Sequence, residues 1–151
     1  MNALLSITKQ STTNPFACLR SRALRSIASG ETSISHSGHW LVGTSADNVS
    51  GVDTEQLSHR HKSFARFVAS ESEYEVLGTL WSTSQLPEIW AWSIKEACFK
   101  CGRGGYEPSD FTIVSARDDV VFVQSGSQSF RVVVSMLMSG YTLAIAFAVS
   151  G

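Results

Sequence analysis

The spacing of hydrophobic and polar residues predicts where helices and strands lie along the chain. Residues 9–15 are polar and end in proline, so residues 1–15 are expected to form a poorly ordered tail before a single domain of residues 16–151. Apolar residues at helical spacing, with arginines between them, then predict a helix over residues 17–27. A serine-glycine pair at residues 29–30 is the signal that ends this helix.

Short strands and helices are predicted to follow this first helix. Weakly alternating apolar runs predict strands over residues 39–45 and 49–54. Apolar residues on one side predict a helix over residues 59–69. Ser70 is expected to cap another short helix, because Glu73 follows it at the spacing of a capping box.

The longest helix and most of the strands are predicted in the second half of the chain. This helix begins near Pro87, which is tolerated in a first turn, and ends at Gly102. Short turn signals then separate four apolar runs, which predict an antiparallel meander over residues 111–115, 120–124, 129–138 and 141–149. The last run is too short to span a bilayer and is predicted to be a buried strand. The order of elements favours the α+β class, with an antiparallel sheet packed against a long central helix.

Residues 90–101 of the central helix divide into two faces when they are placed at about 100° per residue. The apolar face, which is expected to meet the core, consists of Trp90, Ile94, Ala97, Cys98 and Cys101. The other face is expected to be open and carries Trp92, Lys95, Glu96, Phe99 and Lys100. One interpretation is a solvated face with a Glu96–Lys100 ion pair at i, i+4, worth about 0.3–0.5 kcal/mol. The two aromatics on that face favour a contact with something other than water.

Two carboxylates stand at the end of the strand predicted over residues 49–54. Asp53 and Glu55 project to the same side, because side chains alternate along a strand. Such a pair repels unless a cation lies between its members, and Mg²⁺ is the usual cation for oxygen ligands. Glu96 is the natural third ligand. The alternative is a polar strand end in a loop, and the pattern by itself leaves both interpretations open.

Composition narrows the class of protein. The chain has 12 lysine and arginine residues against 13 aspartate and glutamate residues, a net charge of −1, so no basic field favours nucleic acid or a membrane as partner. Without a clear export signal, a cytoplasmic location is expected. Cys98 and Cys101 form a C-x-x-C pattern without the second pair that a zinc site needs. They are therefore expected to be reduced core thiols.

Four short elements, which follow one another along the chain in the family's order, resemble the 4′-phosphopantetheinyl transferase superfamily. Residues 51–55 (GVDTE) match its G-[IV]-D-x-E strand, and residues 92–100 (WSIKEACFK) match its [FW]-[ST]-x-K-E-[AS]-x-x-K helix. Between them, residues 67–73 (FVASESE) resemble the family's phenylalanine followed by a serine and acidic turn. Upstream, residues 34–37 (ISHS) resemble an element of the larger, surfactin-synthetase-type members. Those members are pseudo-dimers of two similar halves, and the short segment before Gly51 implies that the first half is reduced here.

The resemblance implies an activity and a metal site. The activity is the Mg²⁺-dependent transfer of 4′-phosphopantetheine from coenzyme A to a serine of an acyl or peptidyl carrier protein. Asp53, Glu55 and Glu96 are expected to hold the Mg²⁺. Glu96 is the expected base for the serine proton. Lys100 is expected to stabilise the charge that builds on the leaving 3′,5′-ADP.

The resemblance also implies which residues bind coenzyme A. Lys95 and Lys100 are expected to contact its phosphates, and Ser35 and His36 to contact the nucleotide portion. Alone, His36 has the ordinary alternative of a turn or core histidine. The basic residues 59–62 (HRHK) fit either a solvated helix face or a docking surface for an acidic carrier protein.

The reduction of the first half that the resemblance implies leaves several functional alternatives open. A homo-oligomer can rebuild the site, or the chain can be a weakened enzyme. A degenerate module that binds coenzyme A or a carrier without reacting is a second class of function. A small α+β interaction protein with a coincidental acidic site is a third.

Overall fold

A computed structural model describes residues 3–9, 31–46, 50–80, 86–102, 107–138 and 140–149. The first half of the chain supplies the strands β1 Ala3–Lys9, β2 Glu31–Ser37, β3 Trp40–Ala46 and β4 Ser50–Asp53. The middle supplies the helices α2 Lys62–Val68, α3 Glu71–Leu80 and α4 Pro87–Cys101, with a 3₁₀ turn, η1, at Pro108–Asp110. The last part supplies the strands β5 Thr112–Arg117, β6 Val120–Ser125, β7 Gln128–Met136 and β8 Thr142–Val149.

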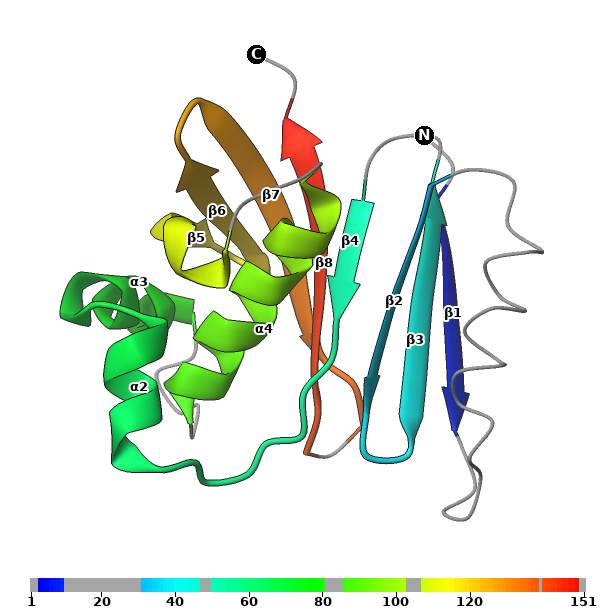
Figure 1. Cartoon of the computed structure of the whole chain (residues 1–151), viewed down its shortest axis with the longest axis horizontal. Helices are drawn as coiled ribbons and strands as arrows, with labels where there is room; N and C mark the ends of the chain where they lie inside the picture. Colours follow the sequence, from blue (N-terminus) through cyan, green and yellow to red (C-terminus); the bar gives the residue numbers. More distant parts are fainter. Residues whose placement is uncertain are drawn as a thin grey trace.

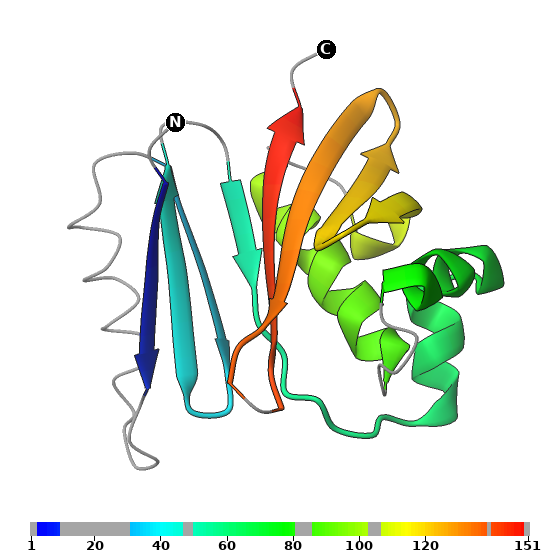
Figure 2. The same cartoon turned by 180° about the vertical axis from the view of Figure 1, so that it is seen from behind.

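The strands form two antiparallel sheets that stand side by side (Figures 1 and 2). The larger sheet has the order β4-β8-β7-β6-β5, and the smaller has the order β1-β3-β2. Figure 1 shows α4 across one face of the larger sheet, with α2 and α3 beside it on the side away from the smaller sheet. The predicted α+β class and the long central helix are confirmed, as is the meander of the last four strands.

The main core lies between α4 and the inner face of the larger sheet. All five residues of the predicted apolar face of α4 are buried, together with alternating residues of β6, β7 and β8. Cys98 and Cys101 are core thiols, as predicted. Burial raises the pKa of Cys98 well above its usual value and that of Cys101 to about 11, so both thiols stay protonated at neutral pH. Among the described helices, none is long and apolar enough to cross a membrane.

Several local predictions can be compared with the structure. Residues 3–9 were expected to belong to a poorly ordered tail, but they form β1, which pairs along its whole length with β3. The helix predicted over residues 17–27 lies outside the described residues. The capping box is present, because Ser70 N–H donates to Glu73 Oε2 at 2.8 Å and Glu73 N–H donates to Ser70 Oγ at 3.4 Å. The helix predicted from residue 59 begins at residue 62, where the His61 side chain caps it.

Three serine hydroxyls of β2 join the two sheets. The edge of β4 that faces away from β8 presents backbone N–H groups to β2 rather than to a paired strand. Val52 N–H donates to Ser33 Oγ at 3.0 Å and Thr54 N–H to Ser35 Oγ at 3.3 Å. Gln56 N–H donates to Ser37 Oγ at 2.9 Å. The two-residue period of a strand puts all three hydroxyls on one face, so side chains replace the missing backbone partner.

Gly51 lets α4 lie directly on β4. A Cβ atom at this position would overlap the carbonyl oxygen of Ala97 and would lie 2.5 Å from the backbone nitrogen of Cys101. Gly51 and Asp53 project to the same face of the strand, because they are two residues apart. The close approach at Gly51 therefore fixes how near Asp53 comes to the side chains of α4.

We expect Gly51→Ala to destabilise the fold by about 2–3 kcal/mol, because the new methyl group meets helix backbone that cannot move without separating α4 from β4. Urea unfolding followed by circular dichroism measures the change. Gly78→Ala is the matched control: a Cβ at this exposed position in α3 has no atom within 4 Å in the described structure. It should stabilise the chain by about 0.5–1 kcal/mol. Equal effects of the two variants would contradict the close contact at Gly51.

Candidate active site

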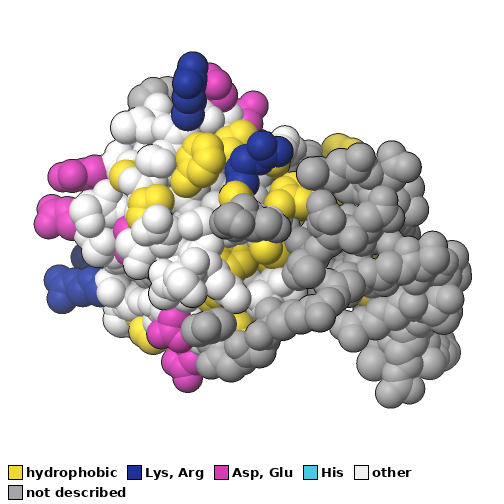
Figure 3. All heavy atoms as spheres, turned by 90° about the horizontal axis from the view of Figure 1, so that it is seen from above, with side chains coloured by type: hydrophobic (Ala, Val, Ile, Leu, Met, Phe, Trp, Pro, Cys, Tyr) yellow, Lys and Arg dark blue, Asp and Glu magenta, His cyan; other side chains and the backbone are white. Residues whose placement is uncertain are grey.

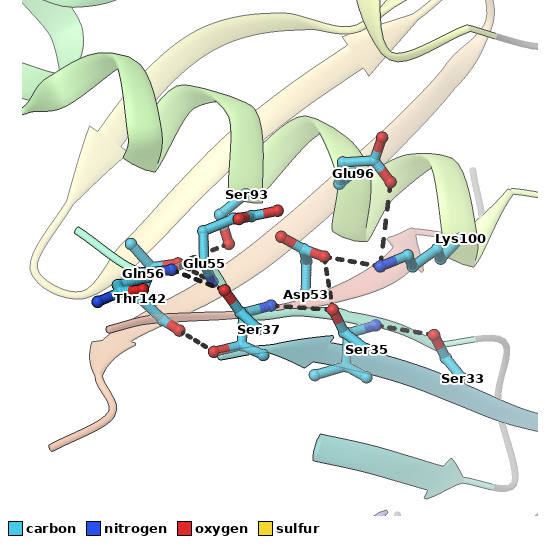
Figure 4. Close-up of polar contacts among 12 residues, drawn as sticks. Ser33, Ser35, Ser37, Asp53, Glu55, Gln56, Ser93, Glu96, Lys100 and Thr142 are labelled. Atoms are coloured by element: carbon cyan, nitrogen blue, oxygen red, sulfur yellow. Dashed lines mark hydrogen bonds and ion pairs between the residues drawn. The ribbon is translucent and has the colours of Figure 1, made fainter. Parts of the chain in front are cut away.

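The Asp53 carboxylate lies between β2 and α4 and is the centre of the site (Figure 4). Its Oδ1 atom accepts a hydrogen bond from Ser35 Oγ at 2.8 Å and one from Lys100 Nζ at 2.6 Å. The side chain is only 3% exposed. Its second oxygen, Oδ2, is buried and has no hydrogen-bond partner among the described residues. A buried carboxylate oxygen without a partner is costly, so this atom is suited to accept a cation or a donor that comes from outside.

Glu96 faces Asp53 from the helix. The Glu96 Oε2 atom lies 3.9 Å from Lys100 Nζ, so the lysine ammonium lies near both carboxylates. Burial raises the pKa of Glu96 above its usual value, Lys100 lowers it, and the negative charge of Asp53 raises it further. The charge of Asp53 is thus close enough to affect the pKa of Glu96.

Glu55 is the third carboxylate of the site. Burial raises its pKa first, and the charge of Asp53 adds to the rise. Arg60, Lys100 and a hydrogen bond from Trp92 act in the opposite direction. The Arg60 guanidinium lies 3.6 Å from Glu55 Oε2, at the exposed rim of the site. We call Asp53, Glu55 and Glu96 the acid group.

A chain of buried hydroxyls holds the backbone of Glu55. Thr142 Oγ1 donates to Ser93 Oγ on α4 at 2.9 Å and accepts from Glu55 N–H at 3.0 Å. Thr142 N–H also donates to Glu55 O at 2.8 Å. Ser93, which is fully buried, therefore ties α4 to the strand end instead of acting as a nucleophile. This link fixes the backbone of Glu55 relative to α4, the helix that carries Glu96.

The acid group fits a divalent cation in its chemistry but is not arranged as a finished metal site. No three His, Cys, Asp or Glu side chains in the described ranges stand together as a set that could hold one metal ion. Instead, Lys100 supplies the positive charge between Asp53 and Glu96. The unpartnered Oδ2 atom of buried Asp53 is the observation that fits a hard cation with oxygen ligands.

The structure corrects the placement of Lys95. The prediction that it lies on the open face with Glu96 and Lys100 is wrong, because its side chain is only 4% exposed. Its Nζ atom lies 2.8 Å from Glu73 Oε1 and donates to the carbonyl of Val68 at 2.8 Å. Lys95 thus joins α4 to α2 and α3 and is not brought to the acid group.

Ser35 and His36 point to opposite faces of β2. Ser35 is buried and donates to Asp53, so it orients a carboxylate of the acid group. His36 is exposed on the other face, as expected for the next residue of a strand. The structure therefore brings Ser35 to the site and does not bring His36 there. Contact of either residue with the nucleotide stays a prediction.

Several residues support the site through contacts that the sequence did not predict. Thr142 comes from β8, far along the chain, and no local pattern marks it as a partner of Glu55. Glu73 was expected only to cap α3, yet it also pairs with Lys95 and accepts from Ile113 N–H at 2.9 Å. The serines of β2 did carry a signal, since Ser33, Ser35 and Ser37 repeat with the period of a strand.

One comparison with known proteins identifies the family of the chain. The model of the 4′-phosphopantetheinyl transferase superfamily matches residues 50–146, more than half of the chain. The chain therefore belongs to the 4′-phosphopantetheinyl transferase superfamily. The matched segment contains the whole acid group and Lys100. No curated protein sequence matches the chain.

We expect Glu73→Gln to destabilise the fold by roughly 3–5 kcal/mol, because it leaves the buried Lys95 ammonium without its counter-ion. Burial alone would raise the pKa of Glu73, but the hydrogen bonds from Lys95 and from the backbone of Ser70 and Ile113 lower it below 4.5. The stabilisation is therefore present above about pH 4.5 and is lost as the pH falls through the folded-state pKa.

Denaturant unfolding at a series of pH values tests this prediction. The difference between the wild-type chain and Glu73→Gln should be largest near neutral pH and should shrink below about pH 4. Glu75→Gln, an exposed position in the same helix, is the control and should change stability by less than about 0.5 kcal/mol. A pH-independent difference would show that the ion pair is not its source.

Proposed function

We propose that this chain transfers 4′-phosphopantetheine from coenzyme A to a serine of an acyl or peptidyl carrier protein, with Mg²⁺ held by the acid group. The observation that carries the proposal is the buried Asp53 carboxylate, whose Oδ2 atom is unpartnered in the described structure and whose neighbours are Glu96 and Lys100. A buried carboxylate beside a partly exposed lysine suits a reaction between a pyrophosphate and a hydroxyl. The family match over residues 50–146 supports the same reaction class.

The proposed reaction transfers one 4′-phosphopantetheinyl group through attack at phosphorus. The serine oxygen of the carrier attacks the phosphorus that bears pantetheine, and the bond from that phosphorus to the bridging oxygen of the pyrophosphate breaks. The leaving group is 3′,5′-ADP, and the serine proton passes to Glu96. A Mg²⁺ ion at the acid group would neutralise charge on the pyrophosphate. Lys100 contributes most where charge grows on the leaving oxygen, because such contacts favour the transition state over the ground state.

The exposed face of α2 is the proposed docking surface for the carrier. His59, Arg60 and His61, which directly precede α2, are exposed, as are Lys62 and Arg66 within it, and Phe67 is 68% exposed. Arg60 also reaches Glu55, so this basic surface adjoins the acid group. On the described part of the end seen in Figure 3, charged side chains are scattered among hydrophobic and uncharged ones. A local basic surface would speed encounter with an acidic carrier.

The decisive experiment is to incubate the chain with coenzyme A, Mg²⁺ and an apo carrier protein, and to measure the mass of the carrier. We expect the carrier to gain one phosphopantetheine group. Glu96→Gln should slow the gain by about 100-fold or more, because it removes the group that accepts the serine proton. Glu88→Gln, near the other end of α4, is the control and should keep the wild-type rate. An unchanged rate in Glu96→Gln would remove Glu96 from the mechanism.

The competing function is a module that binds coenzyme A or a carrier without reacting. It is favoured by Lys100, which stands where the divalent cation would be expected. Calorimetry with coenzyme A separates the two functions. Tight binding together with no mass gain in any of several carriers would support the binding module and would refute the transferase.

We expect Arg66→Glu on α2 to raise the KM for the carrier by roughly tenfold while the KM for coenzyme A stays unchanged, because it reverses a charge on the proposed docking surface alone. Steady-state kinetics with each substrate varied in turn measures the two constants. Arg131→Glu is the matched control, since Arg131 is exposed on β7 in the other layer of the molecule. Equal effects of the two charge reversals would show that α2 has no special part in docking.

A further inference from the structure

Lys100 neutralises the acid group from within the chain. Its ammonium is 2.6 Å from Asp53 Oδ1 and 3.9 Å from Glu96 Oε2, so one positive charge serves two carboxylates. Without it the nearly buried Asp53 would lack a cationic partner among the described residues, since Arg60 pairs with Glu55 at the rim. An unpaired charge at such a depth strongly destabilises a fold. Lys100 is therefore the resident counter-ion of the site.

Lys100 and a divalent cation compete for the same carboxylates. A hard cation that binds Asp53 and Glu96 needs their oxygens at close range, and the Lys100 ammonium already lies 2.6 Å from an oxygen of Asp53 and 3.9 Å from one of Glu96. Two cations this close repel strongly where water is largely excluded. A divalent cation held by Asp53 and Glu96 would therefore repel the Lys100 ammonium from its present position.

The side chain of Lys100 is free to leave, whereas that of Lys95 is not. Lys100 lies in the last turn of α4 and is 26% exposed, so its flexible stem can carry the ammonium outward without unfolding the helix. Lys95, on the same helix, is 4% exposed and is held by Glu73 and by the carbonyl of Val68. Of the two lysines of α4, Lys100 alone contacts carboxylates that a divalent cation could also bind and has a path to solvent.

We propose that a divalent cation displaces the Lys100 ammonium from Asp53, and that this displacement frees Lys100 to bind the phosphates of the donor substrate. The release of Lys100 stands on the geometry of the acid group, while its use for phosphates rests on the proposed function. The acid group and Lys100 then work in sequence: the lysine stabilises the metal-free chain, and the metal turns it into a phosphate-binding residue.

The first test measures the lysine itself in the wild-type chain. Acetylation by an N-hydroxysuccinimide ester, read by peptide mass spectrometry, reports how exposed each lysine amine is. We expect the rate at Lys100 to rise severalfold on addition of Mn²⁺ or Mg²⁺ at constant ionic strength, while the exposed Lys62 keeps its rate and Lys95 stays protected. A Lys100 rate that is unchanged or reduced by the cation would overturn the proposal.

The second test measures the affinity for Mn²⁺ alone, by the paramagnetic resonance signal of the free ion. We expect Lys100→Met to bind Mn²⁺ at least about tenfold more tightly than the wild-type chain, because it removes the competing charge. Lys100→Gln, which keeps a hydrogen-bond donor for Asp53, should show the same direction and guards against misfolding of the methionine variant. Lys100→Arg and Lys62→Met should not bind more tightly than the wild-type chain.

The outcomes separate this proposal from the proposed function. Equal or weaker Mn²⁺ binding by both uncharged variants, or binding by neither of them nor the wild-type chain at millimolar Mn²⁺, would refute the competition. A chain that releases Lys100 on Mn²⁺ binding but modifies no carrier leaves the competition standing and refutes the transferase. If the chain modifies carriers while the cation leaves the labelling rate of Lys100 unchanged, the transferase stands and the competition is refuted.

Discussion

The burial of one carboxylate, Asp53, is the constraint on which the rest of the site depends. A charge that is 3% exposed must be neutralised and hydrogen-bonded, and both requirements are met by side chains from other elements. Ser35 comes from the smaller sheet and Lys100 from α4, so the demands of one side chain hold three elements together. The arrangement satisfies only one oxygen from within the described chain. The site therefore has one carboxylate oxygen that the chain itself satisfies and a second that favours a ligand.

Two absences in β4, a side chain at Gly51 and, within the described sheets, a paired strand on one edge, set how closely the elements around Asp53 pack. Gly51 has no side chain, so the backbone of α4 rests on β4 and presents Glu96 and Lys100 to the next residue on the same face. On its other edge β4 has no paired strand within the described sheets, and the serines of β2 receive its N–H groups. Small residues on both sides thus allow a helix and a second sheet to reach the same short strand. A larger residue at either contact would move one partner of the carboxylate away.

Much of the fold could be predicted from the sequence because its signals are local. The meander, the buried face of α4 and the Ser70 capping box each follow from periodicity or spacing within one segment. The acid group also has a local signature, since residues two apart share a face of a strand. Contacts between segments have no such signature. The partner of Lys95 lies on another helix, and Thr142 reaches Glu55 across 87 positions of sequence.

The two lysines of α4 show why a helical wheel alone could not assign their roles. They are five residues apart and point in directions that differ by about 140°, toward opposite edges of the helix's buried arc. At one edge α2 and α3 cover Lys95, and α3 supplies Glu73, so Lys95 forms a buried structural ion pair. At the other edge Lys100 stays 26% exposed beside Asp53, whose Oδ2 atom has no hydrogen-bond partner among the described residues. A lysine is structural where it forms a buried ion pair, as Lys95 does. It is available for chemistry where another cation can replace it beside its carboxylates, as we propose for Lys100.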